Sequence, residues 1–245
     1  MHETTAAMLV IGDEILSGKV EDTNAALVRR ELRDLGVALK GIFVIPDDLA
    51  GIAGWIRHLK GRYTYLFTSG GVGPTHDDMT MAGVAEGLGR RLVTSPELAA
   101  DLARVYRAGF NESARKMADI PEGAELIREA SLQVPVTRVD EIYIFPGEPN
   151  IFRRKFLAVK ERFRTAPFFL ARIFTQLDET ELATRMEQAQ ARFQVAVGSY
   201  PVYDSPDYRV QITIEAKSKE KVLEAASFIL EAIPPAQLVR SELPG

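Results

Sequence analysis

The feature that most constrains this chain is a strand that breaks into glycines, within the stretch TYLFTSGGVGPTHDDMT at Thr64–Thr80. A short apolar run ends at Phe67, and the glycine-rich segment 69–75 leads into a helical pattern that begins near Thr80. Glycine accepts positive φ and close approach, so the backbone N–H groups of such a turn are open to an anionic ligand. The stretch predicts a ligand-binding loop at the carboxyl end of a strand.

Apolar runs alternate with helical patterns along the first two thirds of the chain. The expected strands are 6–11, 37–45, 63–67 and 141–145, and the expected helices are 25–35, 49–59, 80–88, one that starts at Ser95, and 151–164. The segments expected to lack long elements are the polar loop 12–19, the turn or two at 111–118 and the stretch 121–138, which is expected to be irregular with short strands. This alternation predicts an α/β fold with a doubly wound, mostly parallel sheet. Ligands bind such sheets outside the carboxyl ends of the strands.

The order of elements changes after Thr165-Ala166-Pro167. The patterns that follow are strands at 168–175, 194–200, 208–215 and 237–240, with helices at 179–191 and 218–232. The order β-α-β-β-α-β is typical of a ferredoxin-like fold. We therefore predict two domains, an α/β domain at 1–166 and a smaller α+β domain at 167–245.

Charge and composition exclude several classes of protein. The 245 residues carry 30 basic and 34 acidic side chains, a net charge of −4, without a basic block, which disfavours nucleic acid as a partner. The absence of cysteine excludes disulfides, thiolate metal sites and a cysteine nucleophile. No signal peptide and no apolar run of membrane-spanning length is visible, so we expect no membrane partner and a cytoplasmic location.

Carboxylates recur in three loops expected at strand ends. They are Asp13, Glu14, Asp47, Asp48, Asp77 and Asp78. Carboxylates beside a phosphate-binding turn repel an anionic ligand unless a cation such as Mg²⁺, Mn²⁺ or Co²⁺ binds both. We predict that Asp13, Asp77 and Asp78 hold a divalent metal. The competing interpretation is that one carboxylate of a pair caps the helix that follows.

The glycine loop fits neither common nucleotide motif. A P-loop requires Gly-Lys-Ser/Thr where this chain has Gly73-Pro74-Thr75, and the dinucleotide fingerprint requires a glycine where His76 stands. Ser69 and Thr75 can donate to phosphate oxygens. His76 is interpreted either as a base or ribose contact, or as a residue with only a local hydrogen bond. The loop alone does not separate phosphate binding from a tight structural turn.

Taken together, the motifs resemble the molybdopterin-binding (MoaB/Mog-like) superfamily, particularly the amino-terminal domain of CinA and the equivalent domain of FAD synthase. The motifs that carry the resemblance are GDEILSG at 12–18 with Asp22-Thr23-Asn24, GGVGPTHDDMT at 70–80, PGEP at 146–149, and the segments 116–118, 121–124 and 198–201. The resemblance covers essentially the whole chain. It implies a MoaB/Mog-like α/β domain followed by a small α/β domain, and neither the deamidase domain of CinA nor the adenylyltransferase domain of FAD synthase is expected.

The resemblance also implies a function and an assembly. Relatives of this type are linked to metal-dependent hydrolysis of ADP-ribose or FAD and commonly self-associate, so a homo-oligomer, with a dimer favoured, is expected. The motifs add Asn24, Pro146, Gly147 and Glu148 to the nucleotide-binding set. Glu148 departs from the apolar residue usual in Pro-Gly-x-Pro and adds negative charge near the expected site.

The leading hypothesis is a divalent-metal-dependent pyrophosphatase that acts on an ADP-containing dinucleotide. The expected catalytic residues are Asp13, Glu14, Asp48 and Asp78. The expected phosphate- and nucleotide-binding residues are Ser69, Gly70, Gly71, Gly73, Pro74, Thr75 and His76, together with those from the resemblance. Two alternatives remain open, namely a protein that binds or adenylylates molybdopterin and a non-catalytic nucleotide-binding subunit.

Overall fold

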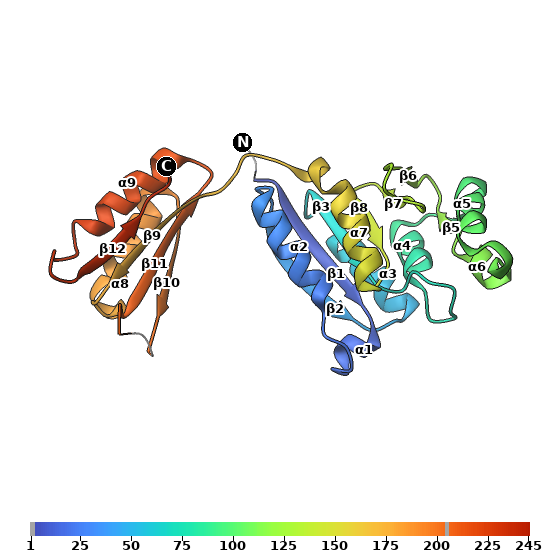
Figure 1. Ribbon diagram of the computed structural model, residues 1–245, viewed down its shortest axis with the longest axis horizontal. Coiled ribbons are helices and arrows are strands. Elements are labelled where there is room, and N and C mark those ends of the chain that lie inside the picture. Colours follow the sequence, from blue (N-terminus) through green and yellow to red (C-terminus); the bar gives the residue numbers. More distant parts are fainter. Residues whose placement is uncertain (1–2, 204–205) are drawn as a thin grey trace. The chain divides into compact units, whose positions relative to one another are not determined.

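The computed structural model describes residues 3–203 and 206–245. The chain folds into two compact units, Met1–Thr165 and Ala166–Gly245, referred to below as unit 1 and unit 2 (Figure 1). None of the helices among the described residues combines the length and the apolar character needed to cross a membrane.

Unit 1 is built on a mostly parallel sheet, as predicted. Its strands, in spatial order, are β2 (Ala38–Ile45), β1 (Thr5–Ile11), β3 (Tyr65–Ser69), β8 (Ile142–Phe145), β7 (Val136–Val139) and β6 (Glu125–Ile127). The pairs from β2 to β8 are parallel, and β7 and β6 are antiparallel to their neighbours. The carboxyl ends of β1, β3 and β8 therefore lie side by side, where the glycine turns follow β3 and β8.

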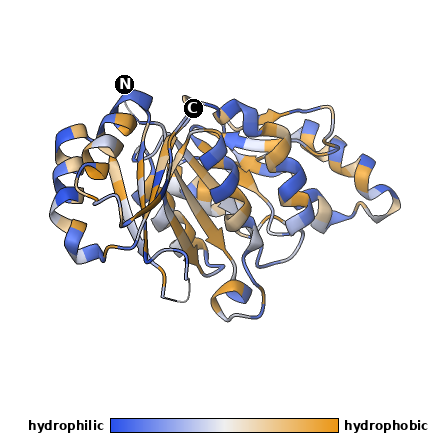
Figure 2. Ribbon diagram, turned by 60° about the vertical axis from the view of Figure 1, so that its left-hand side comes forward, coloured by the Kyte–Doolittle hydropathy of each residue, from blue (hydrophilic) through white to orange (hydrophobic). Residues whose placement is uncertain are grey.

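Helices cover both faces of this sheet. On one face α2 (Thr23–Asp34) and α7 (Pro149–Val159) pack over β1, β3 and β8, and on the other α3 (Leu49–Leu59) and α4 (Thr80–Leu88) pack over the same strands. Figure 2 shows apolar strands enclosed by helices with polar outer faces. The β1 strand has no exposed residue because helices cover both of its faces.

Two of the helices that cover the sheet, α2 and α3, begin after a capping aspartate. The Asp22 side chain accepts from the Ala25 N–H at 2.9 Å, and Asp48 accepts from the Gly51 N–H at 2.7 Å. Each bond satisfies an N–H group that has no partner within its helix. The α4 helix ends at Gly89, whose φ of 67° is the left-handed conformation favourable to glycine.

Further short elements surround the main sheet of unit 1. They are α1 (Asp13–Leu16), β4 (Leu92–Thr94), α5 (Pro96–Tyr106), the 3₁₀ turn Arg107–Gly109, α6 (Glu112–Lys116), β5 (Asp119–Pro121) and the 3₁₀ turn Lys160–Phe163. Three of them differ from expectation: α1 occupies the predicted loop 12–19, and β4 and β5 pair with each other where no strand pair was predicted. Three- and four-residue elements are too short to show a periodic apolar pattern.

Unit 2 has the predicted β-α-β-β-α-β order. Its elements are β9 (Phe169–Thr175), α8 (Glu179–Phe193), β10 (Ala196–Pro201), β11 (Val210–Ala216), α9 (Lys219–Leu230) and β12 (Leu238–Glu242). The strands form an antiparallel sheet in the order β10-β11-β9-β12, with a separate core between the sheet and the two helices. This separate sheet confirms the smaller ferredoxin-like unit that the sequence predicted.

An aromatic cluster forms the centre of unit 1. Phe67 on β3 is fully buried, and its ring centroid lies 5.0 Å from that of Phe163 and 5.7 Å from that of Phe156. Tyr143 and Phe145 on β8 complete its surroundings. These rings join the sheet to the α7 side of the unit and hold β3, which carries the glycine turn, in place.

We expect Phe67→Ala to lower the free energy of unfolding of unit 1 by about 3–5 kcal/mol, because it leaves a cavity among rings that cannot close around it. Denaturant unfolding followed by the fluorescence of Trp55, the single tryptophan, reports on unit 1. Leu92→Ala, at a side chain 42% exposed, is the control and should change stability little. Equal losses in the two variants would contradict the central role of Phe67.

Candidate functional site

The carboxyl ends of three strands meet through backbone contacts at two glycines. Gly70, which follows β3, has a φ of 106°, and a Cβ atom there would collide with the carbonyl oxygen of Ile11 at the end of β1. A Cβ atom on Gly147, after β8, would lie 3.2 Å from the Cα of Gly70. At Gly70 the approach requires a residue without a side chain, and at Gly147 a side chain would push the two turns slightly apart. The two glycine turns are thus one structural feature.

Asn24 on α2 connects the two glycine turns. Its Nδ2 donates to the Ser69 Oγ at 3.0 Å and to the Gly147 carbonyl at 2.8 Å. Asn24 and Ser69 are buried. The Ser69 hydroxyl accepts this bond and keeps its own proton to donate, so a phosphate oxygen is a suitable acceptor for it.

Thr80 fixes the other end of the glycine loop. Its Oγ1 donates to the Gly70 carbonyl at 2.7 Å, and its N–H donates to the Gly71 carbonyl at 3.0 Å. The α4 helix begins after Met79 without a side-chain cap. Its first N–H groups therefore lack a side-chain partner, directly behind the glycine loop.

A small hollow lies beside the two turns. It is lined by residues of the loop after β1, of α2 and of both glycine turns, among them Glu14, Asn24, Ser69, Gly70 and Gly147. Its volume is about 40 Å³. Sites for drug-sized ligands measure roughly 300–1,000 Å³, so this hollow has room for a phosphate-sized group and not for a nucleotide.

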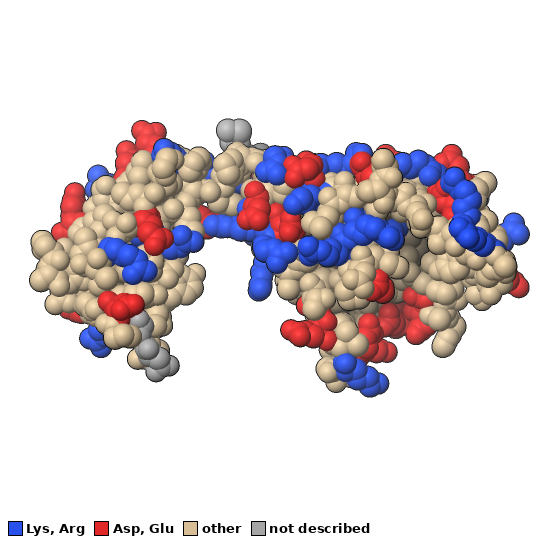
Figure 3. All heavy atoms as spheres, viewed as in Figure 1, with Lys and Arg blue, Asp and Glu red and all other residues tan. Residues whose placement is uncertain are grey.

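Acidic side chains from three loops gather next to these turns. The Asp13 N–H donates to the Asp47 Oδ2 at 2.9 Å. Burial raises the pKa of Asp47, and the negative charges of Glu14, Asp13 and Asp77 raise it further. The loops at Asp13, Asp47 and Asp77 therefore converge, and in Figure 3 acidic side chains gather at the lower edge of unit 1.

Whether these residues can hold a divalent metal ion depends on whether the protein must supply all of the ligands. No group of three or more histidine or carboxylate side chains within residues 3–203 and 206–245 is arranged to hold a metal ion. Asp78 accepts from the Thr75 N–H at 2.8 Å and from the Thr75 Oγ1 at 2.5 Å. The predicted trio of Asp13, Asp77 and Asp78 is thus not assembled as a shell. The acidic cluster instead suits an ion such as Mg²⁺, which keeps several waters and binds one or two carboxylates together with substrate phosphates.

Three other predicted residues have local partners. Asp48 is the N-cap of α3, and Glu148 is the N-cap of α7, where its carboxylate accepts from the N–H groups of Asn150 and Ile151 at 3.1 and 2.7 Å. These backbone hydrogen bonds lower the pKa of Glu148. The His76 side chain is 99% exposed and lies 3.9 Å from Asp77. Asp48 therefore fits the capping interpretation, His76 has only a local neighbour, and Glu148, which was expected near the ligand, serves as a helix cap that the sequence analysis did not predict.

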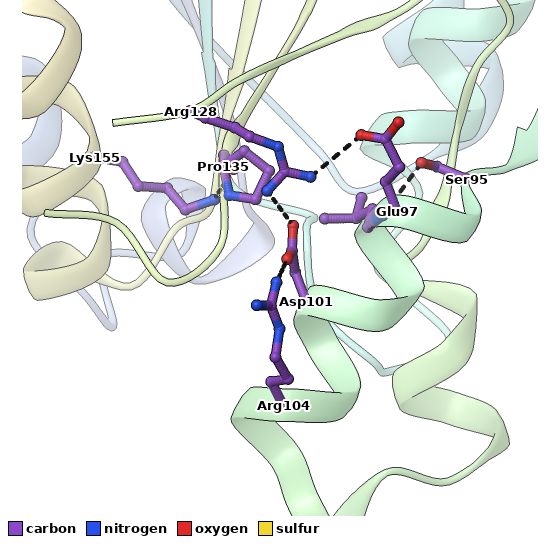
Figure 4. A network of polar contacts seen from close by, with 8 residues as sticks. Ser95, Glu97, Asp101, Arg104, Arg128, Pro135 and Lys155 are labelled. Atoms are coloured by element: carbon purple, nitrogen blue, oxygen red, sulfur yellow. Dashed lines mark hydrogen bonds and ion pairs between the residues drawn. The ribbon is translucent and has the colours of Figure 1, made fainter. Parts of the chain in front are cut away.

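A second, larger hollow lies between α5 and α7. It measures about 150 Å³ and has mainly apolar walls. Lys155 of α7 reaches into this space, and its Nζ donates to the Pro135 carbonyl at 2.6 Å (Figure 4). The sequence did not indicate Lys155, because it follows Arg153 and Arg154 in a basic run typical of a solvated helix face.

Ion pairs around the buried Asp101 connect α5 to the segment 128–135, next to the second hollow. Asp101, 1% exposed, accepts from the Arg128 Nη1 at 2.7 Å and also pairs with Arg104. Arg128 contacts Glu97 at 3.3 Å as well. Figure 4 shows these side chains joining α5 to the segment that carries Arg128 and Pro135. These pairs hold α5 against the segment that carries Arg128, while the α5 residues that line the second hollow are Leu98, Leu102, Val105 and Tyr106.

Comparison with known protein families assigns both units. The family described as "probable molybdopterin binding domain" matches residues 7–165, and the family of the FAD synthase middle domain matches residues 167–242.

Two relatives and one solved structure show the same relationship. The chain is 31% identical over 258 residues to a probable FAD synthase of Caenorhabditis elegans, covering 94% of this chain and 50% of that protein. It is 31% identical over 219 residues to a protein of Archaeoglobus fulgidus, covering 89% and 93% of the two chains. The structure of a CinA protein of unknown function from Thermoplasma acidophilum is 30% identical, with a TM-score of 0.60, and the match covers 66% of this chain and 98% of that one. The chain spans about half the length of the FAD synthases that it matches.

We expect Gly70→Ala to lower the free energy of unfolding of unit 1 by about 1–3 kcal/mol or more, because alanine is strained at this φ and its Cβ meets the Ile11 carbonyl. Gly109→Ala is the matched control, since no atom lies within 4 Å of the added Cβ. Its effect should stay within about 0.5 kcal/mol. Denaturation followed by Trp55 fluorescence measures both, and a Gly70→Ala variant as stable as the control would refute the close approach of the turns.

The stability of unit 1 should rise with pH on account of Lys155. Burial, followed by the charge of Arg154, lowers the pKa of Lys155 from its ordinary value of 10.5 to about 8. Between these two pH values the unfolded chain binds more protons at this residue than the folded chain, so this contribution to the free energy of unfolding increases with pH. Below about pH 8 the charged form costs stability in full.

Lys155→Met should remove this part of the pH dependence. Unfolding measured from pH 7 to pH 11 should give a smaller increase in the variant than in the parent protein. Lys60→Met, at an exposed position after α3, should keep the parent slope. Identical slopes for all three proteins would disprove the lowered pKa.

Proposed function

The chain belongs to the probable molybdopterin-binding domain family, as its motifs predicted, and from this premise we propose that it is a divalent-metal-dependent pyrophosphatase acting on an ADP-containing dinucleotide of the ADP-ribose or FAD class. One observation carries the proposal. Backbone turns suited to phosphate and a cluster of carboxylates lie at the same strand ends, joined by the contact between Gly70 and Gly147.

The phosphate-binding part of the proposed site consists of O–H and N–H groups that are free to donate hydrogen bonds to a ligand. The Ser69 hydroxyl donates to one phosphate oxygen, and the backbone of the glycine loop at 71–73 approaches the others. The α4 helix behind the loop contributes the positive end of its dipole. The hollow of about 40 Å³ accommodates one phosphate of the pyrophosphate.

The carboxylates bind the metal and activate water. Asp13 and Asp77 would hold a hydrated divalent ion that arrives with the substrate, and the bound ion would neutralise charge on the phosphate oxygens. Glu14 lines the hollow and is the proposed base. It takes a proton from a water molecule whose oxygen attacks phosphorus, and the P–O bond to the bridging oxygen breaks. The products are two phosphate monoesters, one of them AMP.

The relatives support a nucleotide substrate. Both units match families named for pterin or flavin-nucleotide proteins, and the second family is the middle domain of FAD synthase. In this proposal FAD would yield AMP and FMN, and ADP-ribose would yield AMP and ribose 5-phosphate. Asp48 is left out of the proposed catalytic set because it caps α3.

A second candidate function follows from the description of the family that matches unit 1. A protein that binds or adenylylates molybdopterin would use the same turns for the pterin phosphate. Calorimetry with molybdopterin and with ADP-ribose separates the two, since tight pterin binding without hydrolysis of either dinucleotide favours this candidate. Nucleotide binding without turnover would indicate the third alternative, a non-catalytic subunit.

We expect AMP release from ADP-ribose or FAD in the presence of Mg²⁺, Mn²⁺ or Co²⁺, measured by chromatography, and none with EDTA. Asp13→Asn and Glu14→Gln should each reduce kcat by at least about 100-fold, because they remove a metal ligand and the base. Asp13 uses its backbone N–H, and not its carboxylate, in the bond to Asp47, so Asp13→Asn preserves that contact.

Asp34→Asn is the matched control, at an exposed carboxylate in the last turn of α2. It should leave AMP release unchanged. Absence of AMP with every pairing of metal and dinucleotide, or equal rates in Asp13→Asn and Asp34→Asn, would rule out the proposed hydrolysis.

A further inference from the structure

The two edge strands of the sheet in unit 2 differ in how they limit pairing with a further strand. The pairing of β12 with β9 has a register shift between Leu238 and Arg240, and the charged side chains of Arg240 and Glu242 are exposed. The other edge strand, β10 (Figure 1), pairs with β11 without a shift, and its sequence AVGSYP has no charged residue. Bulges and charges on an edge strand discourage the addition of another strand. Strand β10 lacks both of these obstacles.

Two residues of β10 direct their backbone groups toward the edge of the sheet. The Val202 N–H donates to the Arg209 carbonyl at 2.8 Å, at the end of the β10–β11 pair. The N–H and C=O groups of an antiparallel strand alternate between its two sides, so those of Val197 and Ser199 point away from β11. Pro201 is the next residue in this alternation, and it has no N–H group. A further strand is therefore anchored at Val197 and Ser199.

A groove of about 470 Å³ lies between β10 and α8. Val197 and Ser199 line it from β10, and Ala183, Met186 and Glu187 line it from α8. The Ser199 hydroxyl is buried and has no hydrogen-bond partner among the described residues. The thioether of Met186 is flexible and adapts to an apolar side chain. An edge strand beside such a groove suits a bound peptide that adds a strand to the sheet and places alternate side chains in pockets.

The charge of the groove distinguishes between two occupants. Glu187 is exposed, and none of the ion pairs found in the described part of the chain includes it. Arg185 and Arg192 of the same helix instead lie over the Phe228 ring, 3.2 and 5.4 Å from its centroid. A second copy that paired through its own β10 would bring another Glu187 to the same strand pair without a cation. A strand that carries a basic side chain is complementary to this carboxylate.

We propose that β10 is a docking edge for an extended segment of a partner protein, which adds antiparallel to β10 and lies along α8. The segment forms backbone hydrogen bonds with Val197 and Ser199, places an apolar side chain against Met186, and places a lysine or arginine at Glu187. Its apolar and basic residues lie two positions apart, because side chains on one face of a strand alternate. The inference uses only unit 2 and is independent of the proposed hydrolysis.

Synthetic peptides labelled with fluorescein test this docking on the full chain. The peptide TKTITKT carries two lysines and an isoleucine on one face, and TETITET is its charge-reversed counterpart. We expect TKTITKT to bind at least about tenfold more tightly than TETITET, measured by fluorescence anisotropy. Glu187→Lys should reverse this preference. Glu224→Lys, at an exposed carboxylate of α9 outside the groove, is the matched control and should keep it.

Methylation of single peptide nitrogens tests the strand pairing without altering the protein. A methyl group on the isoleucine nitrogen of TKTITKT replaces an N–H that faces β10, whereas one on a neighbouring threonine nitrogen faces away from β10. The first should weaken binding by at least about tenfold, and the second should change it little. Ser199→Pro removes an N–H at the edge without removing a bond to β11, and it should also weaken binding.

The results decide between the partner segment and its alternatives. Equal binding of TKTITKT and TETITET, no effect of Glu187→Lys, or equal losses from the two methylated peptides would overturn the docking edge. A dimer in analytical ultracentrifugation that Ser199→Pro dissociates would assign β10 to a second copy of the chain and would overturn it as well. Circular dichroism checks the folding of each variant, and the methylated peptides test the backbone pairing even if Ser199→Pro does not fold.

Discussion

The site depends on one close approach between backbones. Gly70 lies against the Ile11 carbonyl and against Gly147, so the turns after three neighbouring strands share one place. Asn24 then closes the arrangement by donating to Ser69 and to the Gly147 carbonyl. Because the sheet sets the spacing of its strands, this contact exists only if β1, β3 and β8 are adjacent, which the aromatic core around Phe67 maintains. The open amides and the small hollow both follow from it.

Acidic and basic side chains lie in different places around the contact between Gly70 and Gly147. Carboxylates of the loops after β1, β2 and β3 repel one another, and the pKa of Asp47 is raised first by its burial and further by the charges of these neighbours. At the second hollow, Lys155 lies beside mainly apolar walls, and none of the ion pairs found within residues 3–203 and 206–245 includes it.

Local patterns predicted most of the fold. The helices Leu49–Leu59 and Thr80–Leu88 have the predicted bounds, because a capping aspartate precedes the first and a left-handed glycine ends the second. The order of strands and helices in both units also followed from periodicity. The β4–β5 pair and α1 were missed, since three or four residues carry no periodic signal and tertiary contacts decide their conformation.

By itself, the sequence determined the alternating elements, the glycine turns and the presence of carboxylates at strand ends, because these depend on local chemistry and on the rule that parallel strands end at one edge. Only the tertiary structure decided which of those carboxylates are occupied by local N–H groups and which come together from different loops. Asp48, Glu148 and Asp78 bind local N–H groups, whereas Asp13, Glu14, Asp47 and Asp77 from separate loops lie close together. It also decided the surroundings of Lys155, since a lysine in a basic run becomes partly buried only when the segment at Pro135 packs against it.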